Sequence, residues 1–378
     1  MSDTIQGHGQ AALRTRVRET KFCTACGACV NLCPYQAYYQ DEVVTLHVCD
    51  LQEGRCFAFC PRTATDLDSL RARLFDPQDL TPEIGAVKDY SICRAADEKI
   101  RRQAQHGGTV SALMSLALEE GIIDTAVVAQ GGDRFTHQGV AVGEAAEVRK
   151  RGKSKFIAAG TIAAFNRAAQ SDSQKIGVVA TPCQALALAK MRMKPFPEKD
   201  NNIDKLKLVV GLFCGWTLSW KKLIPLLKTR TNLEEIVGMD IPPGKGQVAV
   251  FTQTGAIAIP WEEIDPLVRE GCRICLDTTA EFADISVGSA RLPEDWETLR
   301  SWNQVIVRTK TGQDLIDLAR KKGILEFREV PAEVLEELKK AALNKKRTAL
   351  KTIMEKTGTP EDLIYVDRRD SVICRILG

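Results

Sequence analysis

Short apolar runs alternate with helical patterns through the middle of the chain. The apolar runs lie at residues 122–130, 175–181, 205–213, 283–289 and 304–308. Residues 110–120 and 185–192 carry apolar side chains at helical spacing. Buried strands that alternate with helices form a largely parallel sheet, and its ligand crevice lies at the carboxyl ends of the strands. The pattern therefore predicts an α/β domain over residues 101–330.

The segments on either side of this domain differ in pattern. Residues 67–100 are charged, contain two prolines and show little periodicity, which indicates a linker. Residues 331–378 are mostly amphipathic, which predicts a helical C-terminal region that covers the core or docks a partner. The basic cluster Lys345-Lys346-Arg347 falls within this helical pattern, so it is interpreted as a solvated helix face.

Composition narrows the class of protein. Because 44% of the 378 residues are hydrophobic, the chain can form two or three domains with sizeable cores. The absence of a long apolar run and the polar start of the chain predict no membrane span and no signal peptide, and favour the cytoplasm. Thirteen cysteines in such a chain argue for metal ligands rather than disulfides. A net charge of +3 is too small to indicate nucleic acid.

The N-terminal segment carries the most specific motif. Cys23, Cys26, Cys29 and Cys33, followed by Pro34, have the spacing C-x2-C-x2-C-x3-C-P. In that motif the first three thiolates hold one cubane iron–sulfur cluster, and the cysteine before proline serves a neighbouring cluster. The motif thus predicts a ferredoxin-like module over residues 1–66, with a related second half.

The second half is present but altered. Cys56-x3-Cys60-Pro61 repeats the end of the motif, while the middle cysteine between Cys49 and Cys56 is missing. The crossed arrangement predicts one 4Fe-4S cluster at Cys23, Cys26, Cys29 and Cys60, and three corners of another at Cys33, Cys49 and Cys56. Its fourth corner could be Asp50, Cys93 or water, or be absent as in a three-iron cluster. Structural zinc is the alternative, although zinc sites pair two C-x2-C knuckles and do not need the C-x3-C-P ending.

Four more cysteines lie at or near the ends of predicted strands. Cys183 follows one apolar run, Cys214 follows the next, and Cys272 and Cys275 form a C-x2-C pair. Because parallel strands bring their carboxyl ends to one edge, these thiols are predicted to converge on one site. On count alone they suit an iron–sulfur cluster and zinc equally, and a single buried cysteine can also act as a small hydrophobe.

A glycine turn opens the first predicted helix of the α/β domain. Gly107 and Gly108 precede Thr109, Val110 and Ser111, where the helical pattern begins. Free backbone N–H groups at the positive end of a helix suit a phosphate, and a plain N-cap explains the same residues at least as well. The turn alone therefore leaves both interpretations open.

Between about residues 94 and 327 several motifs follow one another: HGGTVSALMSLALEEG, GVVATPCQALAL, GLFCG, CRICLDTTAEFADISVGSA and VIVRTKTG. Their order closely resembles the flavin-containing beta subunit shared by coenzyme F420-reducing hydrogenases and formate dehydrogenases. The resemblance implies an α/β fold with a small N-terminal bacterial-ferredoxin-like module, a larger α/β FAD-binding domain and a helical C-terminal region. It also implies a 4Fe-4S cluster held by Cys183, Cys214, Cys272 and Cys275. The FAD contacts it implies are Gly107, Gly108, Thr109, Val110, Ser111, Ser154, Lys155, Thr181, Gln184 and Arg308; a surface ion pair is the alternative for Lys155 and Arg308.

The same resemblance implies a role in electron transfer. Iron–sulfur clusters transfer one electron at a time, hydride carriers transfer two electrons together, and flavin can do both. We therefore expect FAD to exchange a hydride with a soluble carrier, with coenzyme F420 favoured, and single electrons to leave through 4Fe-4S clusters to a redox partner subunit. The alternatives are a relay and docking subunit that uses ferredoxin or NAD(P)H, and a ferredoxin-dependent reductase of an organic substrate. No G-x-G-x-x-G fingerprint opens a strand–helix unit, so a nicotinamide site of the Rossmann type is not supported.

Overall fold

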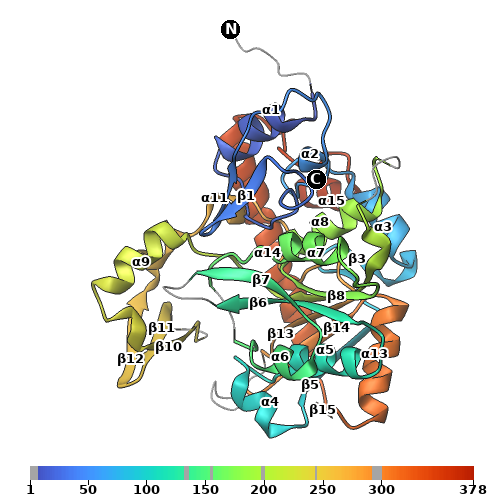
Figure 1. The fold of residues 1–378 in the computed structure, drawn as a ribbon, viewed down its shortest axis with the longest axis vertical. Coiled ribbons are helices and arrows are strands. Elements are labelled where there is room, and N and C mark those ends of the chain that lie inside the picture. The colour runs from blue at the N-terminus through green and yellow to red at the C-terminus, as the bar shows by residue number, and fades with distance from the viewer. Residues whose placement is uncertain (1–6, 132–135, 154–155, 197–200, 243–244, 292–299) are drawn as a thin grey trace.

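The computed structural model describes residues 7–131, 136–153, 156–196, 201–242, 245–291 and 300–378. Within these residues an eight-stranded mixed sheet has the strand order β15-β5-β14-β13-β9-β8-β6-β7 (Figure 1). Its strands are β5 (Asp89–Ala95), β6 (Thr125–Gly131), β7 (His137–Val142), β8 (Ile176–Ala180), β9 (Leu206–Leu212), β13 (Ile285–Ser289), β14 (Asn303–Val307) and β15 (Leu325–Arg328). The middle strands β13, β9, β8 and β6 run parallel, whereas the outer strands pair antiparallel. The predicted α/β class is confirmed, and the parallel arrangement applies to the centre of the sheet.

Helices cover both faces of the parallel strands. Val178 on β8 belongs to an apolar core with α7 (Thr161–Ala169) and α8 (Pro182–Arg192). Its neighbour Val179 belongs to the core on the other face, with α5 (Thr109–Glu119) and α13 (Lys310–Lys321). Because both faces are buried, these strands appear in the sequence as continuous apolar runs rather than as alternating patterns.

The segment 67–100 differs from the linker that its composition predicted. It contains α3 (Leu67–Leu74), the short strands β3 (Leu80–Thr81) and β4 (Gly85–Ala86), β5, and α4 (Glu98–Gln103). Strand β5 pairs with both β14 and β15, so it lies inside the main sheet. Its polar flanks leave only a short apolar stretch at Ile92 and Cys93, which is why the sequence pattern did not indicate a strand.

The N-terminal segment packs on the helices of one sheet face (Figure 1). It contains α1 (Gln10–Leu13), a π-helical turn (Arg14–Arg18), the hairpin of β1 (Gln36–Tyr39) and β2 (Glu42–Thr45), and α2 (Arg55–Ala58). Leu13, Phe57 and Phe59 share one apolar core with α7 and α8. The same core includes residues of α14 (Ala332–Thr357) and α15 (Ser371–Leu377), so the two ends of the chain meet on this face.

A smaller antiparallel sheet forms a lobe beside the main sheet, at the left of Figure 1. It consists of β10 (Ile236–Asp240), β11 (Gln247–Thr252) and β12 (Gly255–Pro260). Its core also includes Leu223 and Leu227 of α9 (Trp220–Lys228). Three further short helices are α6 (Ala145–Arg149), which packs on α5, α10 (Trp261–Ile264), which packs on the lobe, and α11 (Glu270–Arg273).

Candidate functional site

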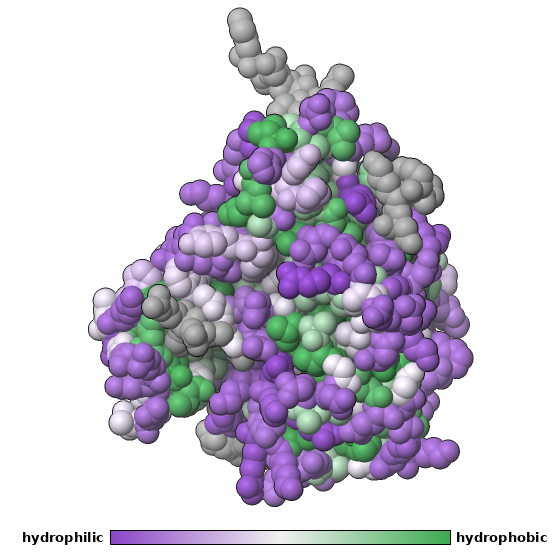
Figure 2. Space-filling view, in the orientation of Figure 1, coloured by the Kyte–Doolittle hydropathy of each residue, from purple (hydrophilic) through white to green (hydrophobic). Residues whose placement is uncertain are grey.

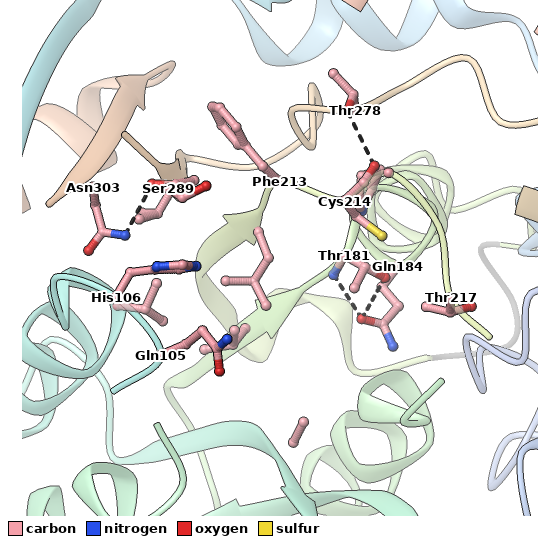
Figure 3. Close-up of a pocket in the computed structure, with 18 of the residues that line it drawn as sticks. Gln105, His106, Thr181, Gln184, Phe213, Cys214, Thr217, Thr278, Ser289 and Asn303 are labelled. Atoms are coloured by element: carbon pink, nitrogen blue, oxygen red, sulfur yellow. Dashed lines mark hydrogen bonds between the residues drawn. The ribbon is translucent and has the colours of Figure 1, made fainter. Parts of the chain in front are cut away.

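A cavity of about 770 Å3 lies at the carboxyl ends of the parallel strands. Its walls include an apolar residue near the end of each of these strands: Val128, Val179, Leu212 and Val287. Figure 3 shows His106, just before α5, on one side of the cavity and Thr181 and Cys214 on the other. Open parallel sheets bind their ligands at this edge, so the cavity is the candidate site.

The glycine turn before α5 is shaped by its neighbours. Gly108 has a φ of 77°, a left-handed conformation that a side chain would strain. A Cβ on Gly107 would lie 2.7 Å from the Asn303 Oδ1, and the same oxygen accepts a hydrogen bond from the Thr109 N–H at 3.3 Å. The residues of the turn that line the cavity are Gly108, Thr109, Val110 and Ser111, while Gly107 packs behind them.

Thr181 and Gln184 line the cavity and also begin α8. The Gln184 Oε1 accepts a hydrogen bond from the Thr181 N–H at 2.8 Å, and the Gln184 Nε2 donates to the Ala159 carbonyl at 2.6 Å. Together they form a capping box, which fixes the first turn of the helix. Because Cys183 lies in that turn, the box also fixes the position of its thiol.

The four strand-end cysteines, Cys183, Cys214, Cys272 and Cys275, all line this cavity. Burial, and then the nearby thiols, raise the pKa of Cys214. Cys275 differs, because the positive charges of Arg62 and Lys345 outweigh its burial and lower the pKa of its thiol. The strands therefore bring together the cysteines that the sequence placed in one set, and their role as cluster ligands stays a prediction.

Several N-terminal cysteines lie around one small cavity, and their division into two ligand sets stays a prediction. A cavity of about 20 Å3 is lined by the first set, Cys23, Cys26, Cys29 and Cys60, and by Cys56. In the second set, Cys33 and Cys49 lie close enough to Cys56 for their negative charge to raise the pKa of its thiol. Burial raises the pKa of Cys56 and of Cys60 to about 11, so metal binding is what these thiols need in order to ionise near neutrality.

The candidates for the fourth corner of the second set differ in position. Cys93 lies on β5 in the core of the main sheet, with its sulfur 3.7 Å from the Thr109 Oγ1. Cys56 belongs to the core on the other sheet face. The structure therefore places Cys93 away from this set. Asp50 is exposed and directly follows Cys49, so it remains a candidate ligand.

The N-terminal set and the cavity set adjoin each other. Burial, and next the thiol of Cys183, raise the pKa of Cys26. Within the described ranges, no three His, Cys, Asp or Glu side chains converge as the ligands of a single metal ion do. The thiols instead border open space, an arrangement that suits thiolates bound to separate irons of a cluster.

Ser154 and Lys155, both predicted FAD contacts, lie outside the described residues. The residues beside them are described. The Lys153 Nζ donates a hydrogen bond to the Val237 carbonyl of the lobe at 3.2 Å, and Lys153 lines the cavity. Phe156 packs against Trp216, which lines the cavity too.

Arg308 requires a correction. Its side chain is only 1% exposed, and it is absent from the described residues that line the cavity. All five N–H donors of its guanidinium have protein acceptors: Ser286 Oγ, the carbonyls of Ile84, Ala86 and Thr279, and Thr279 Oγ1. Burial lowers its pKa to about 10. Arg308 is thus an internal link between loops, neither a flavin contact nor a surface ion pair.

Two residues at the cavity were missed from the sequence. Asn303 begins β14 and holds the glycine turn, and its Nδ2 donates to the Gly288 carbonyl at 3.1 Å. Lys345 extends from α14, and its Nζ donates to the Cys214 and Gly215 carbonyls at 2.8 Å each. The prediction of a solvated helix face is wrong for Lys345, because nothing in a basic helical pattern shows that one lysine reaches the Cys214 loop.

The α/β fold, the cavity and the gathered thiols fit the class of iron–sulfur oxidoreductases. A model of a 4Fe-4S binding domain matches residues 17–39. Two models described as the N-terminal and C-terminal parts of the coenzyme F420 hydrogenase/dehydrogenase beta subunit match residues 91–166 and 173–333. The chain belongs to this coenzyme F420 hydrogenase/dehydrogenase beta subunit family.

Several relatives agree with this assignment. The beta subunit of coenzyme F420 hydrogenase from Methanothermobacter thermautotrophicus is 34% identical over 71% of this chain and 95% of that protein. The coenzyme F420-dependent sulfite reductase of Methanocaldococcus jannaschii is 28% identical over 85% of this chain and 49% of that protein. A chain of the F420-reducing NiFe hydrogenase complex from Methanosarcina barkeri has a TM-score of 0.67 and 29% identity, covering 73% of this chain and 94% of that chain. No helix in the described part of this chain is long and apolar enough to cross a membrane.

Proposed function

We propose that this chain is the flavin-bearing electron-transfer subunit of a larger redox complex. It exchanges a hydride between a soluble carrier, coenzyme F420, and FAD, and it passes single electrons through 4Fe-4S clusters to a partner subunit. The observation that supports this most is the cavity that joins the amino end of α5 to four cysteines. A bound flavin supplies the exchange between electron pairs and single electrons. The coenzyme F420 relatives favour that carrier over the alternatives.

The residues around the cavity fit a flavin nucleotide. The first N–H groups of α5 lack partners within the helix, and Val110 and Ser111 line the cavity, where their N–H groups suit a pyrophosphate. The Thr109 N–H already donates to Asn303 Oδ1. The apolar wall at Val128, Val179 and Leu212 suits a flat ring system. Lys153 and Arg291 also line the cavity, and their charge suits an anionic cofactor or carrier.

The thiols fit cubane clusters in the same way. Thiolate is the ligand that iron–sulfur clusters require, and one set of four cysteines lines the large cavity while another lines the small N-terminal one. The N–H of Thr217 donates to the Cys272 sulfur at 3.4 Å, and the Thr181 hydroxyl lies 3.4 Å from the Cys183 sulfur. Hydrogen bonds to sulfur of this kind help to set cluster potentials.

A Gly108→Ala variant tests the flavin site. The left-handed φ of 77° strains an added side chain, and its Cβ would lie 3.1 Å from Ile100 Cγ2, so the start of α5 must shift. We expect FAD content after anaerobic reconstitution to fall about tenfold, with iron content unchanged. Gly121→Ala is the matched control, because Gly121 has a φ of 66° at the far end of α5 and open space around it. Equal FAD content in both variants would remove α5 from the proposed site.

The unmodified chain, purified without oxygen, distinguishes the proposed function from its alternatives. Bound FAD that is bleached by reduced coenzyme F420 supports the oxidoreductase. A chain with iron but no FAD points to the relay and docking subunit instead. Reduction of an organic substrate with ferredoxin alone, without a partner subunit, points to the third function.

The outer face of the N-terminal module is the proposed docking surface for the partner subunit. Large apolar side chains are exposed on the β1–β2 hairpin and on the segment that leads to Cys49, with Tyr39 61%, Leu46 55% and Val48 83% exposed. Figure 2 shows apolar side chains over this end of the molecule.

A Tyr39→Asp/Leu46→Asp variant should keep its iron and FAD and lose about tenfold or more in partner affinity, measured by co-purification from the native complex. Val237→Asp, on the lobe and 48% exposed, is the control; equal losses in both variants would contradict the assignment.

A further inference from the structure

Two buried cations lie between the N-terminal cysteine set and the cavity set. Arg62 is 2% exposed and Lys190 is 7% exposed. Among the described residues neither has a carboxylate within ion-pair distance. The contrast with Arg71 is clear, because Arg71 is equally buried and pairs with Asp370 at 2.7 Å.

The partners of these two cations are neutral groups. Arg62 donates to the Gly271 carbonyl through Nε at 3.1 Å and Nη2 at 3.0 Å, and its guanidinium lies 4.8 Å from the centre of the Tyr365 ring. The Lys190 Nζ donates to the Cys60 carbonyl at 2.7 Å, to the Thr65 Oγ1 at 2.9 Å and to other oxygens of the same loop. These bonds satisfy the donors but leave two positive charges in the interior.

Each cation comes from one cysteine-bearing element and reaches the other. Arg62 directly follows Cys60-Pro61 of the N-terminal set, and it contacts Gly271, next to Cys272, and borders Cys183 and Cys275. Lys190 lies seven residues after Cys183 on α8, on the same helix face two turns later, and it binds the Cys60 loop. Each of the two elements therefore places a positive charge beside the cysteine set of the other element.

Uncompensated charges in an interior are unfavourable unless an opposite charge lies nearby. A cubane held by four thiolates carries net negative charge in every common oxidation state, and each added electron increases it. A fixed cation beside such a cluster therefore stabilises the reduced form and raises the reduction potential. The two interior charges are explained if clusters lie at both sets.

We propose that Arg62 and Lys190 set the potentials of the two adjoining clusters, Arg62 acting on the cavity cluster and Lys190 on the N-terminal cluster. This inference rests on the proposed function, since it needs clusters at both sets. Both are positioning residues that act through charge, and they bind neither iron nor flavin themselves. Because Arg62 also adjoins Cys60, each cation acts mainly, and not solely, on its own cluster.

The test uses the full chain with its clusters, titrated without oxygen against redox dyes and followed by electron paramagnetic resonance. In Arg62→Met the ratio of reduced to oxidised cavity cluster at fixed ambient potential should fall about tenfold, which equals ~59 mV for one electron. In Lys190→Met the same fall should appear at the N-terminal cluster, and the other cluster should change less in each variant. Arg62→Lys and Lys190→Arg keep the charge and should restore the potentials.

The outcomes of this titration distinguish failure of the inference from failure of the proposed function. Neutral variants with full iron content and unchanged potentials overturn the inference, as do variants that shift both clusters equally. Should Arg62→Met lose iron, Arg62→Gln and the Lys190 pair carry the same comparison. Unmodified chain that binds no iron at these sets contradicts the proposed function itself, whereas clusters with unmoved potentials contradict this inference alone.

Discussion

A Cys272→Ser variant is expected to lose one-electron output and to keep part of its uptake of hydride. The change removes one of the four thiols at the cavity and, with it, about four irons per chain. The glycine turn and the α8 cap, which we propose as flavin contacts, lie on other elements and stay in place. Reduction of a one-electron dye by reduced coenzyme F420 should fall about 100-fold or more, since even changes beyond the metal ligands cost 10–100-fold.

Iron and flavin analysis accompany the rate measurement. Unmodified chain should hold roughly eleven or twelve irons if the second N-terminal set is filled, and about eight if it is empty. Cys374→Ser is the matched control, because Cys374 is exposed, its thiol donates to the Arg368 carbonyl, and it does not line the cavities beside the two cysteine sets. One-electron output that survives the loss of Cys272 would falsify the proposed path.

An Asp41→Ala variant should lower the stability of the whole chain by about 3–5 kcal/mol. Asp41, in the turn between β1 and β2, is 1% exposed and pairs with Arg269 at 2.5 Å. It also accepts a hydrogen bond from the Trp220 N–H at the start of α9. Arg269 in turn donates to the Cys23 carbonyl, so the pair joins the cysteine loop of the module to the lobe. Removing the carboxylate leaves a buried guanidinium without its charge partner.

The neighbouring residue supplies the control for this loss. Glu42 pairs with Lys221 across the same junction, but both side chains are about half exposed. Glu42→Gln should therefore cost less than about 1 kcal/mol. Thermal unfolding of the loaded chain under anaerobic conditions, with release of cluster absorbance as a second signal, measures both variants. Similar midpoints for Asp41→Ala and Glu42→Gln would show that the buried pair does not hold the module in place.

The parts of the fold that the sequence predicts well are those buried on both faces. The strands β8 and β9 could be predicted without knowing which elements pack against them, because a strand covered on both faces is apolar throughout. Strand β5 depends on its partners, since only its pairing with β14 and β15 makes a short, polar-flanked segment a strand. The same holds for the antiparallel lobe, whose half-exposed strands carry a weaker pattern.

The N-terminal cysteines could be grouped from their spacing, whereas the four cavity cysteines were grouped from their places near strand ends and from the family resemblance. The cations could not be assigned in this way. Arg308, Arg62 and Lys345 look alike in the sequence, yet the first links loops, the second borders two cysteine sets and the third supports the Cys214 loop. What separates them is the surface that tertiary packing presents to each side chain.

The common apolar core of the N-terminal module, α7, α8 and α14 has an evolutionary consequence. A free ferredoxin meets its partners by diffusion and can be exchanged for another. A ferredoxin-like segment that shares its apolar core with the host domain cannot be exchanged without changing that core. Swapping this module between relatives would require a matching set of helix surfaces. Changes in the segment and in the helix surfaces that pack against it are therefore expected to be inherited together.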